Sequence, residues 1–256
     1  MKRYETGATL IVVLVFLVAL TIIGTLAIRQ SVVGLGIATN SQAQQLQAQN
    51  SDASFFKAED RERLSEALSG IGMFGYTSKP VDREKELVFC YRGDQREFFK
   101  MSLASIVDWE SGSAPRNNVK GKSGYCDATV QPTNFFTSAR RAVMTQVSIK
   151  FLAQPTGVGQ TLFGDRVAGS DDKQVQLDKA KRIKVFAVSV MPTLSKVSRT
   201  DINVCLQERM NEVTIPEGET IADNNPVRQT VSACLANLGV PFSTYVTEYL
   251  LVDFVK

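Results

Sequence analysis

The chain has 256 residues, of which 44% are hydrophobic and 21% are charged, a composition that is ordinary for a globular protein. The formal net charge is +3 and no basic run is longer than two residues, so the sequence lacks the patch of Lys and Arg that marks nucleic-acid-binding proteins. The chain contains no histidine, which excludes histidine metal ligands and removes the commonest acid–base group of enzymes. We therefore expect no nucleic-acid partner, no metal and no cofactor.

The first element is an uncharged apolar stretch from Ala8 to Ile28. Its roughly 20 residues match what a helix rising about 1.5 Å per residue needs to cross a hydrocarbon core about 30 Å thick. A secretory signal has a shorter apolar region of about 7–15 residues, although the small residues around Thr25-Leu26-Ala27 keep signal cleavage as one alternative. A plain membrane anchor is the other alternative. Neither of them explains Gly7, which ends the polar head.

Helical periodicity continues beyond the apolar stretch. Phe56, Leu64 and Leu68 fall on one helical face, with charged residues between the first two. Two glycines typical of a helix end follow, Gly70 and Gly72. The pattern predicts one helix from about residue 9 to residue 69, whose amphipathic last third packs on a globular domain.

The middle of this predicted helix, from Gln30 to Ser51, carries no charge and is rich in Gln, Ala, Ser and Asn. A neutral, weakly apolar segment suits packing among other helices in a bundle. A solvated stalk is the alternative. Gly34 and Gly36 are the place where we expect a kink or close packing.

The N-terminal region resembles a known family. Lys2-Arg3, then Gly7, then a long apolar helix is similar to a type III (prepilin) signal. The stretch GATLIVVLVFLVALTIIG resembles the N-termini of type IV pilins and pseudopilins. Its continuation, RQSVVGLGIATNSQAQQLQAQNSDASFFKAED, resembles the PilX-like minor pilins, and the likeness covers about residues 1–60.

The resemblance implies a processing site and a topology. A prepilin peptidase would cut between Gly7 and Ala8, and the new amino group of Ala8 would be methylated. Residues 1–7 would be the leader, 8–28 the transmembrane part of the helix, 29–72 its periplasmic part and 73–256 a periplasmic head. The protein would sit in the inner membrane with a single span before it enters a fibre outside the cell.

One position departs from the family pattern. Most pilins carry Glu at the fifth residue of the mature chain, where this sequence has Val12. In the family that carboxylate attracts the N-terminus of the subunit ahead in the fibre, and a lone carboxylate in lipid is costly. A subunit with none ahead of it does not need the carboxylate, so Val12 favours a priming or tip-proximal role. The alternative is that Val12 is simply part of the anchor.

The resemblance also implies the partners: other minor pilins and the major pilin, the prepilin peptidase and the inner-membrane assembly platform, with a tip adhesin as a further candidate. It implies a structural protein and not an enzyme. This structural protein would help to initiate a type IV pilus and would enter it near the tip. A type II secretion pseudopilin is one alternative. A membrane-anchored periplasmic enzyme or binding protein is the alternative from another class.

Four cysteines lie beyond the predicted helix, and none forms a C-x-x-C pair, so neither a zinc ribbon nor a thioredoxin-like site is indicated. If the anchor places this part in the periplasm, an even number of cysteines indicates disulfides. Three pairings are open. We favour the sequential pairs, Cys90–Cys126 and Cys205–Cys234, with buried free thiols as the alternative.

The chain after Gly72 is long enough for one substantial domain of about 180 residues or two small ones. Alternating apolar and β-branched residues predict strands at 86–92, 142–154, 181–191, 200–207 and 244–256, with 181–191 in the centre of the sheet. Asn225 and Pro226 predict the start of a helix that stops at Gly239, so Cys205–Cys234 would join helix to sheet. Residues from 102 onward favour helix weakly. The fold class is therefore α+β: a long N-terminal helix packed on an antiparallel sheet.

Two loop segments invite binding-site interpretations. Gly121-Lys122-Ser123 is not a phosphate-binding loop, because Arg116 stands where that motif needs glycine. Three carboxylates could serve as calcium ligands, but they lack the spacing of a calcium loop, so we expect a solvated turn there: Asp165, Asp171 and Asp172. No motif for a Ser or Cys nucleophile is present.

Overall fold

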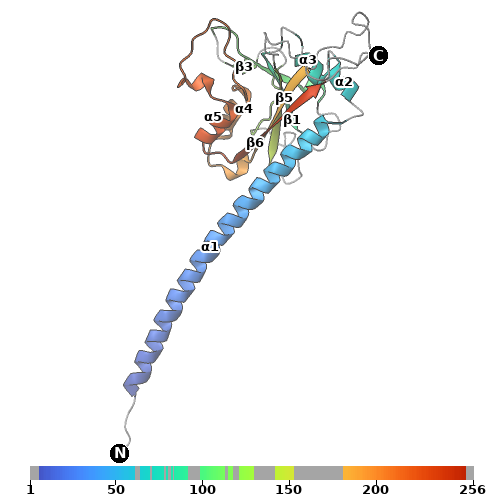
Figure 1. The fold of residues 1–256 in the computed structure, drawn as a ribbon. Coiled ribbons are helices and arrows are strands. Elements are labelled where there is room, and N and C mark those ends of the chain that lie inside the picture. Colours follow the sequence, from blue (N-terminus) through green and yellow to red (C-terminus); the bar gives the residue numbers. More distant parts are fainter. Residues whose placement is uncertain are drawn as a thin grey trace, which may run out of the picture. The chain divides into compact units, whose positions relative to one another are not determined.

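A computed structural model describes residues 6–60, 64–69, 71–77, 79, 82, 84–91, 99–112, 115–117, 121–129, 142–152 and 181–251 (Figure 1). The chain divides into two compact units, Met1–Gln45 and Leu46–Lys256. The boundary lies within the long helix, whereas the sequence placed the start of the head at residue 73. A long apolar helix with an antiparallel sheet confirms the general α+β class.

The first unit is the N-terminal part of helix α1 (Thr6–Ala58). The helix runs through Gly34 and Gly36 without a break in its secondary structure. Its apolar side chains from Leu10 to Ile37 are exposed rather than packed. By length and composition, this is one helix among the described residues that could span a membrane.

The predicted helix end at residue 69 is wrong. Helix α1 ends at Ala58, and two short helices follow it, α2 (Leu64–Leu68) and α3 (Met73–Thr77). Ala67, Met73 and Phe74 from these two helices belong to the same core cluster as Ala58 at the end of α1. Gly72 lies in the bend between α2 and α3, and a Cβ there would lie 2.1 Å from the carbonyl oxygen of Glu66, so this close approach requires glycine.

Within the described residues, six antiparallel strands form one sheet in the order β3-β2-β1-β4-β5-β6. Their bounds are β1 Glu86–Tyr91, β2 Ser105–Asp108, β3 Arg116–Asn117, β4 Met144–Leu152, β5 Lys181–Val190 and β6 Phe242–Leu251. Strand β5 lies between β4 and β6, as expected of a strand that is apolar on both faces. The predictions of strands at β1, β4, β5 and β6 are confirmed.

Two other local predictions are wrong. Residues 200–207, predicted as a strand, form helix α4 (Arg199–Gln207), because the Ser198 side chain accepts the Thr200 N–H and caps the first turn. Its buried residues follow helical spacing: Ile202, Cys205 and Leu206. Residues from 102 onward form the end of a 3₁₀ turn, η3 (Met101–Leu103), and then strand β2.

The predicted C-terminal helix is split in two. Asn225 caps only a 3₁₀ turn, η5 (Pro226–Arg228), and Thr230 caps the helix proper, α5 (Val231–Asn237). The helix ends just before Gly239, whose φ of 67° suits glycine at a helix stop. A further 3₁₀ turn, η4 (Pro192–Leu194), follows β5.

Helices cover both faces of the sheet within the second unit (Figure 1). On one face, α2, α3 and the last turns of α1 pack on apolar residues of the central strands, among them Leu87, Phe89, Val147, Ile183 and Val185. On the other face, α4 and α5 pack on Cys90, Met144, Val188 and Val190. The segment between α4 and α5 covers Val88, Val107 and Trp109.

Candidate functional site

The residues of the expected processing site lie at the start of α1. Gly7 and Ala8 are in its first turns, and the side chain of Ala8 falls outside the described part of the structure. Val12 lies one turn further on and is exposed, like the apolar residues around it. The only charge between Ala8 and Ser51 is Arg29. This surface can bury itself in lipid or among apolar helices, and it offers no carboxylate to a neighbouring N-terminus.

The part of α1 in the second unit meets the sheet through polar residues. Gln47, Ser51 and Ser54 are buried, and together with Ala58 they recur about once per helical turn. The Gln47 side chain donates to the carbonyl oxygen of Pro241 at 3.1 Å. The Ser51 hydroxyl lies 2.8 Å from the hydroxyl of Ser189 on β5. The helix is therefore held on the sheet by hydrogen bonds as well as by apolar contact.

This polar face was missed from the sequence. The sequence placed Phe56 with Leu64 and Leu68 on the packed face of the helix, but the Phe56 side chain is 77% exposed. A usable signal was present, because Gln47, Ser51 and Ser54 have the i, i+4, i+7 spacing of one helical face. The prediction of the packed face relied on large apolar residues and charges alone.

The last turn of α1 is fixed to the edge strand. The Tyr249 phenol on β6 donates to a carboxylate oxygen of Glu59 at 2.7 Å. Burial, and then the hydrogen bond to Glu59, raises the pKa of Tyr249 above its ordinary value. The phenol therefore remains a donor across the physiological pH range. Together with the contact of Gln47 near the start of β6, this bond shows that residues 47–59 run in the same direction as β6.

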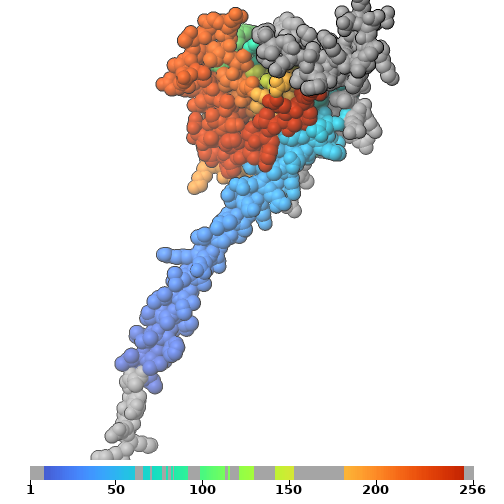
Figure 2. All heavy atoms as spheres, viewed as in Figure 1, coloured from blue at the N-terminus to red at the C-terminus, as the bar shows by residue number. Residues whose placement is uncertain are grey.

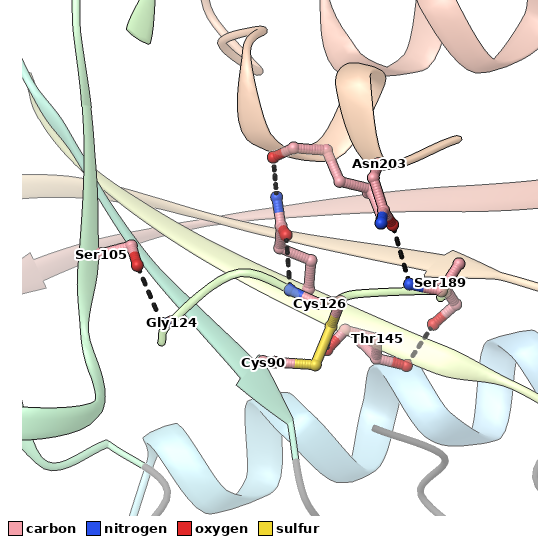
Figure 3. The surroundings of a disulfide bond; sticks show 10 residues. Cys90, Ser105, Gly124, Cys126, Thr145, Ser189 and Asn203 are labelled. Carbon is pink, nitrogen blue, oxygen red and sulfur yellow. Dashed lines mark hydrogen bonds between the residues drawn. A yellow bond between two sulfur atoms is a disulfide. The ribbon is translucent and has the colours of Figure 1, made fainter. Parts of the chain in front are cut away.

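The first disulfide fixes a connecting segment onto the sheet (Figure 3). Cys90 on β1 is bonded to Cys126, and their Cα atoms are 4.9 Å apart. The backbone N–H of Cys126 donates to the Gln146 side chain at 3.1 Å, and that side chain donates to the carbonyl oxygen of Leu206 at 2.8 Å. The Gly124 N–H donates to the Ser105 hydroxyl at 2.8 Å. Residues 121–126 are thus tied to β1, β2 and β4.

The second disulfide joins two helices. Cys205 on α4 is bonded to Cys234 on α5, and their Cα atoms are 5.5 Å apart. The structure therefore forms both of the sequential pairs that the sequence favoured, and the described residues include no free cysteine. The expected link from helix to sheet is corrected to a link from helix to helix, because residues 200–207 are helical.

A buried carboxylate fixes the segment that follows α4. Glu86 is fully buried, and its side chain accepts three hydrogen bonds: from the Asn211 N–H at 3.0 Å, the Asn211 side chain at 3.1 Å and the Glu212 N–H at 2.8 Å. Burial raises the pKa of the Glu86 carboxyl, although these donors and Lys150 act in the opposite direction. The carboxylate satisfies backbone groups that would otherwise be left without partners.

Two lysines complete this polar cluster. Lys150 on β4 donates to the carbonyl oxygen of Glu212 at 2.7 Å and to the Thr214 hydroxyl. Burial lowers the pKa of Lys150, against the attraction of Glu86 and Glu212. Lys184 on β5 pairs with the Glu212 carboxylate at 2.7 Å near the surface. All these groups bind residues 211–214, which follow α4, to the sheet. The role of this polar cluster is therefore structural.

The binding sites considered from the sequence have different outcomes. The carbonyl oxygen of Gly121 accepts a hydrogen bond from the Ser105 hydroxyl at 2.7 Å. Gly121 lies in a turn and not in a loop that joins a strand to a helix. The three carboxylates considered for calcium lie outside the described residues: Asp165, Asp171 and Asp172. Within the described part, no group of acidic residues and cysteines has the geometry of a metal site.

A cavity of about 250 Å³ opens beside the end of α1. Its apolar lining includes Ala67, Met73 and Phe99, and side chains of both charge signs surround it, Lys57, Asp60, Glu66 and Lys100. Because the charged side chains around the cavity have both signs, they do not favour one class of ligand.

No protein-family model, no curated protein and no solved structure matches this chain.

Proposed function

We propose that this protein is a PilX-like minor pilin, which helps to initiate a type IV pilus and is incorporated at or near its tip. The observation that carries the proposal is the composition of α1. Exposed apolar side chains cover its N-terminal turns, while Gln47, Ser51 and Ser54 in the same helix pack on an antiparallel sheet. A subunit that is held in a membrane before it enters a fibre needs one helix that anchors it in the membrane and also packs on its globular head.

In this proposal the prepilin peptidase removes residues 1–7 and leaves Ala8 as the methylated first residue of the mature chain. The polar head of the precursor, MKRYET, precedes Gly7 directly, and helix α1 begins at Thr6. The peptidase therefore acts at the membrane surface, where the polar head meets the apolar helix.

The proposed place near the tip depends on Val12. A shaft subunit uses a carboxylate at this position to attract the N-terminus of the subunit ahead. The Val12 side chain cannot do so, and it avoids the cost of burying an unpaired carboxylate in lipid. A subunit that starts the fibre has no subunit ahead of it, so the missing carboxylate removes no attraction that this subunit could have used.

The proposed location is the inner membrane, with a single span and the head in the periplasm, and later the fibre outside the cell. Two disulfides fit an oxidising compartment of this kind. The proposed partners are other minor pilins, the major pilin and the assembly platform, with a tip adhesin as a further candidate. The role is structural and has no catalytic step.

The experiment is a count of surface pili by electron microscopy in a strain that lacks the gene. We expect few pili, with the shaft subunit still present in the membrane, and a partial return of pili when retraction is also disabled. The return is expected because slow initiation then no longer competes with retraction. A normal number of pili in the deletion strain would contradict the proposal and would favour a secretion pseudopilin or an unrelated anchored protein.

The same strains test the role of Val12. Val12→Glu should not increase the amount of this subunit in the fibre, since the added carboxylate has no positive partner and costs about 2–3 kcal/mol in the membrane. Val12→Leu is the matched control and should behave as wild type. Incorporation of the Glu variant along the whole shaft would contradict the tip-proximal place of this subunit and would leave Val12 as part of the anchor.

A further inference from the structure

Two buried ionisable side chains of the polar cluster lie opposite each other on neighbouring strands. Glu86 on β1 and Lys150 on β4 are direct partners in the antiparallel pairing, so they lie on the same face of the sheet. Glu86 is fully buried and Lys150 is only 4% exposed. Residues directly opposite each other in such a pair have Cβ atoms about 4.5–5.5 Å apart. An amine and a carboxyl group are therefore held near each other at a place that excludes water.

The third member of this group is a carboxamide, that of Asn211. Its side-chain nitrogen Nδ2 donates to the Glu86 carboxylate at 3.1 Å, and its backbone N–H donates to the same oxygen at 3.0 Å. The side-chain oxygen Oδ1 of Asn211 is buried and has no hydrogen-bond partner among the described residues. A buried acceptor without a partner is uncommon in native proteins and calls for an explanation, of which a reactive role is one.

The Lys150 side chain reaches the segment that carries this carboxamide. Its Nζ donates to the carbonyl oxygen of Glu212 at 2.7 Å and to the hydroxyl of Thr214. Glu212 directly follows Asn211 in the chain, so the lysine nitrogen lies beside the residue that bears the carboxamide. A neutral amine has two N–H donors and one lone pair, and these two hydrogen bonds use both donors. The lone pair remains available as a nucleophile.

Burial favours the protonation states that an acyl transfer needs. Burial lowers the pKa of Lys150 and raises the pKa of Glu86, because a site without water disfavours the charged form of each group. An amine that has lost its proton is a nucleophile, and a neutral carboxyl group beside it can donate a proton. In Figure 2 the orange part of the chain, to which residues 211–214 belong, forms part of the outer surface of the head. The three side chains meet beneath this segment.

We propose that Lys150 and Asn211 form an amide bond between their side chains, with Glu86 as the proton carrier. The Nζ atom of Lys150 attacks the side-chain carbonyl carbon Cγ of Asn211. The bond from Nζ to Cγ forms, the bond from Cγ to Nδ2 breaks, and ammonia leaves. Glu86, which is already hydrogen-bonded to Nδ2, donates a proton to this leaving nitrogen and takes one from Nζ, so it returns to its initial state. No oxidant or reductant is required.

The product links β4 covalently to the segment that joins α4 to α5. Thiols do not break an amide bond, so this link persists under conditions that reduce the two disulfides. The neighbouring lysine on β5 lacks the same environment, because the Lys184 side chain is 23% exposed and pairs with the Glu212 carboxylate at 2.7 Å. The inference concerns the head alone and does not depend on the proposed role in a pilus.

The test is the mass of the full chain, purified from membranes in detergent and then reduced and denatured. After correction for the N-terminus found in the same sample, we expect the wild type to be lighter than its sequence by one ammonia. Protease digestion should give one branched peptide that contains both Lys150 and Asn211. Lys150→Met and Glu86→Gln should each restore the full mass. Asn211→Asp can form the same bond with loss of water, so its deficit should be one water instead of one ammonia.

Lys184→Met is the matched control, because it removes the neighbouring lysine of the cluster, and it should keep the deficit of one ammonia. Recovery of both disulfides before reduction shows that each variant has folded, so that a missing bond is not the result of misfolding. A wild-type chain of full mass would overturn the proposal. A deficit of one ammonia that persists in Lys150→Met would overturn it as well, because an asparagine that cyclises to a succinimide loses ammonia without a lysine.

Discussion

The hydroxyl of Ser51 on α1 lies 2.8 Å from the hydroxyl of Ser189 on β5, and Ser189 lies 2.7 Å from the Thr145 hydroxyl on β4. Three buried hydroxyls from one helix and two strands thus form a chain of hydrogen bonds. Figure 3 shows the part of it that joins Ser189 to Thr145. Each additional group in a buried network of this kind makes the position of the helix more specific.

Enlarging the residue at this contact should be more harmful than removing its hydrogen bond. Ser51→Ala leaves Ser189 bonded to Thr145, so we expect a loss of about 1 kcal/mol in the free energy of unfolding. Ser51→Leu places a large side chain in a filled space and should cost about 1–3 kcal/mol or more. The exposed neighbour gives the control, Asp52→Ala, with little effect. Chemical denaturation in detergent measures all three, and equal stability of the Leu variant would show that the helix is not packed here.

Gly124 is expected to tolerate no side chain. A Cβ there would lie 2.2 Å from the Ser105 nitrogen and 2.4 Å from the Val88 carbonyl oxygen, both backbone atoms. Gly124→Ala should therefore lower the unfolding free energy by several kcal/mol, about 3 or more. In Gly36→Ala the new methyl group meets nothing within 4 Å, so head stability should not change. Thermal unfolding followed by circular dichroism compares the two, and a wild-type transition in the Gly124→Ala variant would contradict the close approach.

Loss of the second disulfide should destabilise the link between α4 and α5. Cys205 and Cys234 are 29 residues apart, and closing a loop of this length is worth about 3 kcal/mol in the chain-entropy account. We expect the double Ala variant to lose about this much stability and to be less abundant in cells. Peptide mapping without reductant should recover Cys90–Cys126 and Cys205–Cys234 from the wild type. Free thiols in protein isolated from the periplasm would refute the pairing.

Glu86 should make stability depend on pH. The folded state raises the pKa of this carboxyl, so the folded chain holds the proton more tightly than the unfolded chain. The contribution of Glu86 to stability is therefore largest below its unfolded pKa of about 4.3 and falls as pH rises to the folded pKa. Glu86→Gln removes this dependence, so the stability advantage of wild type over the variant should shrink as pH rises through that window.

Denaturation at a series of pH values measures the effect. Glu248→Gln is the control, because Glu248 forms an exposed pair with Arg182 that contributes little. A stability advantage of wild type over the Glu86→Gln variant that grows with pH would contradict the assigned direction of the pKa shift.

The strands at the centre of the sheet could be predicted because β-branched and aromatic residues are concentrated over seven or more residues, as in the run that contains Val185 and Phe186, which is apolar on both faces. The error at residues 200–207 came from a short apolar run in which Ile202, Val204 and Leu206 satisfy a period of two, although Ile202, Cys205 and Leu206 also satisfy the helical period. The cap at Ser198 would have decided between them, because its side chain binds the Thr200 N–H.

The contacts of the candidate site were less accessible from the sequence. The role of Glu86 depends on Asn211 and Glu212, more than 120 residues away, and on the path of the chain after α4. The packing of α1 depends on small polar residues that carry no hydrophobic signal. Both features come from tertiary contacts, which local propensity and periodicity do not contain.

The mature N-terminus is the measurement that tests the central proposal most directly. Mass analysis of the protein from membranes should find a chain that begins at N-methyl-Ala8. Gly7→Val should leave the precursor uncut and membrane-bound, while Gly24→Val, a matched change further along the same helix, should be processed normally. A mature chain that begins at Ile28, or an uncut wild-type chain, would contradict the assignment as a pilin.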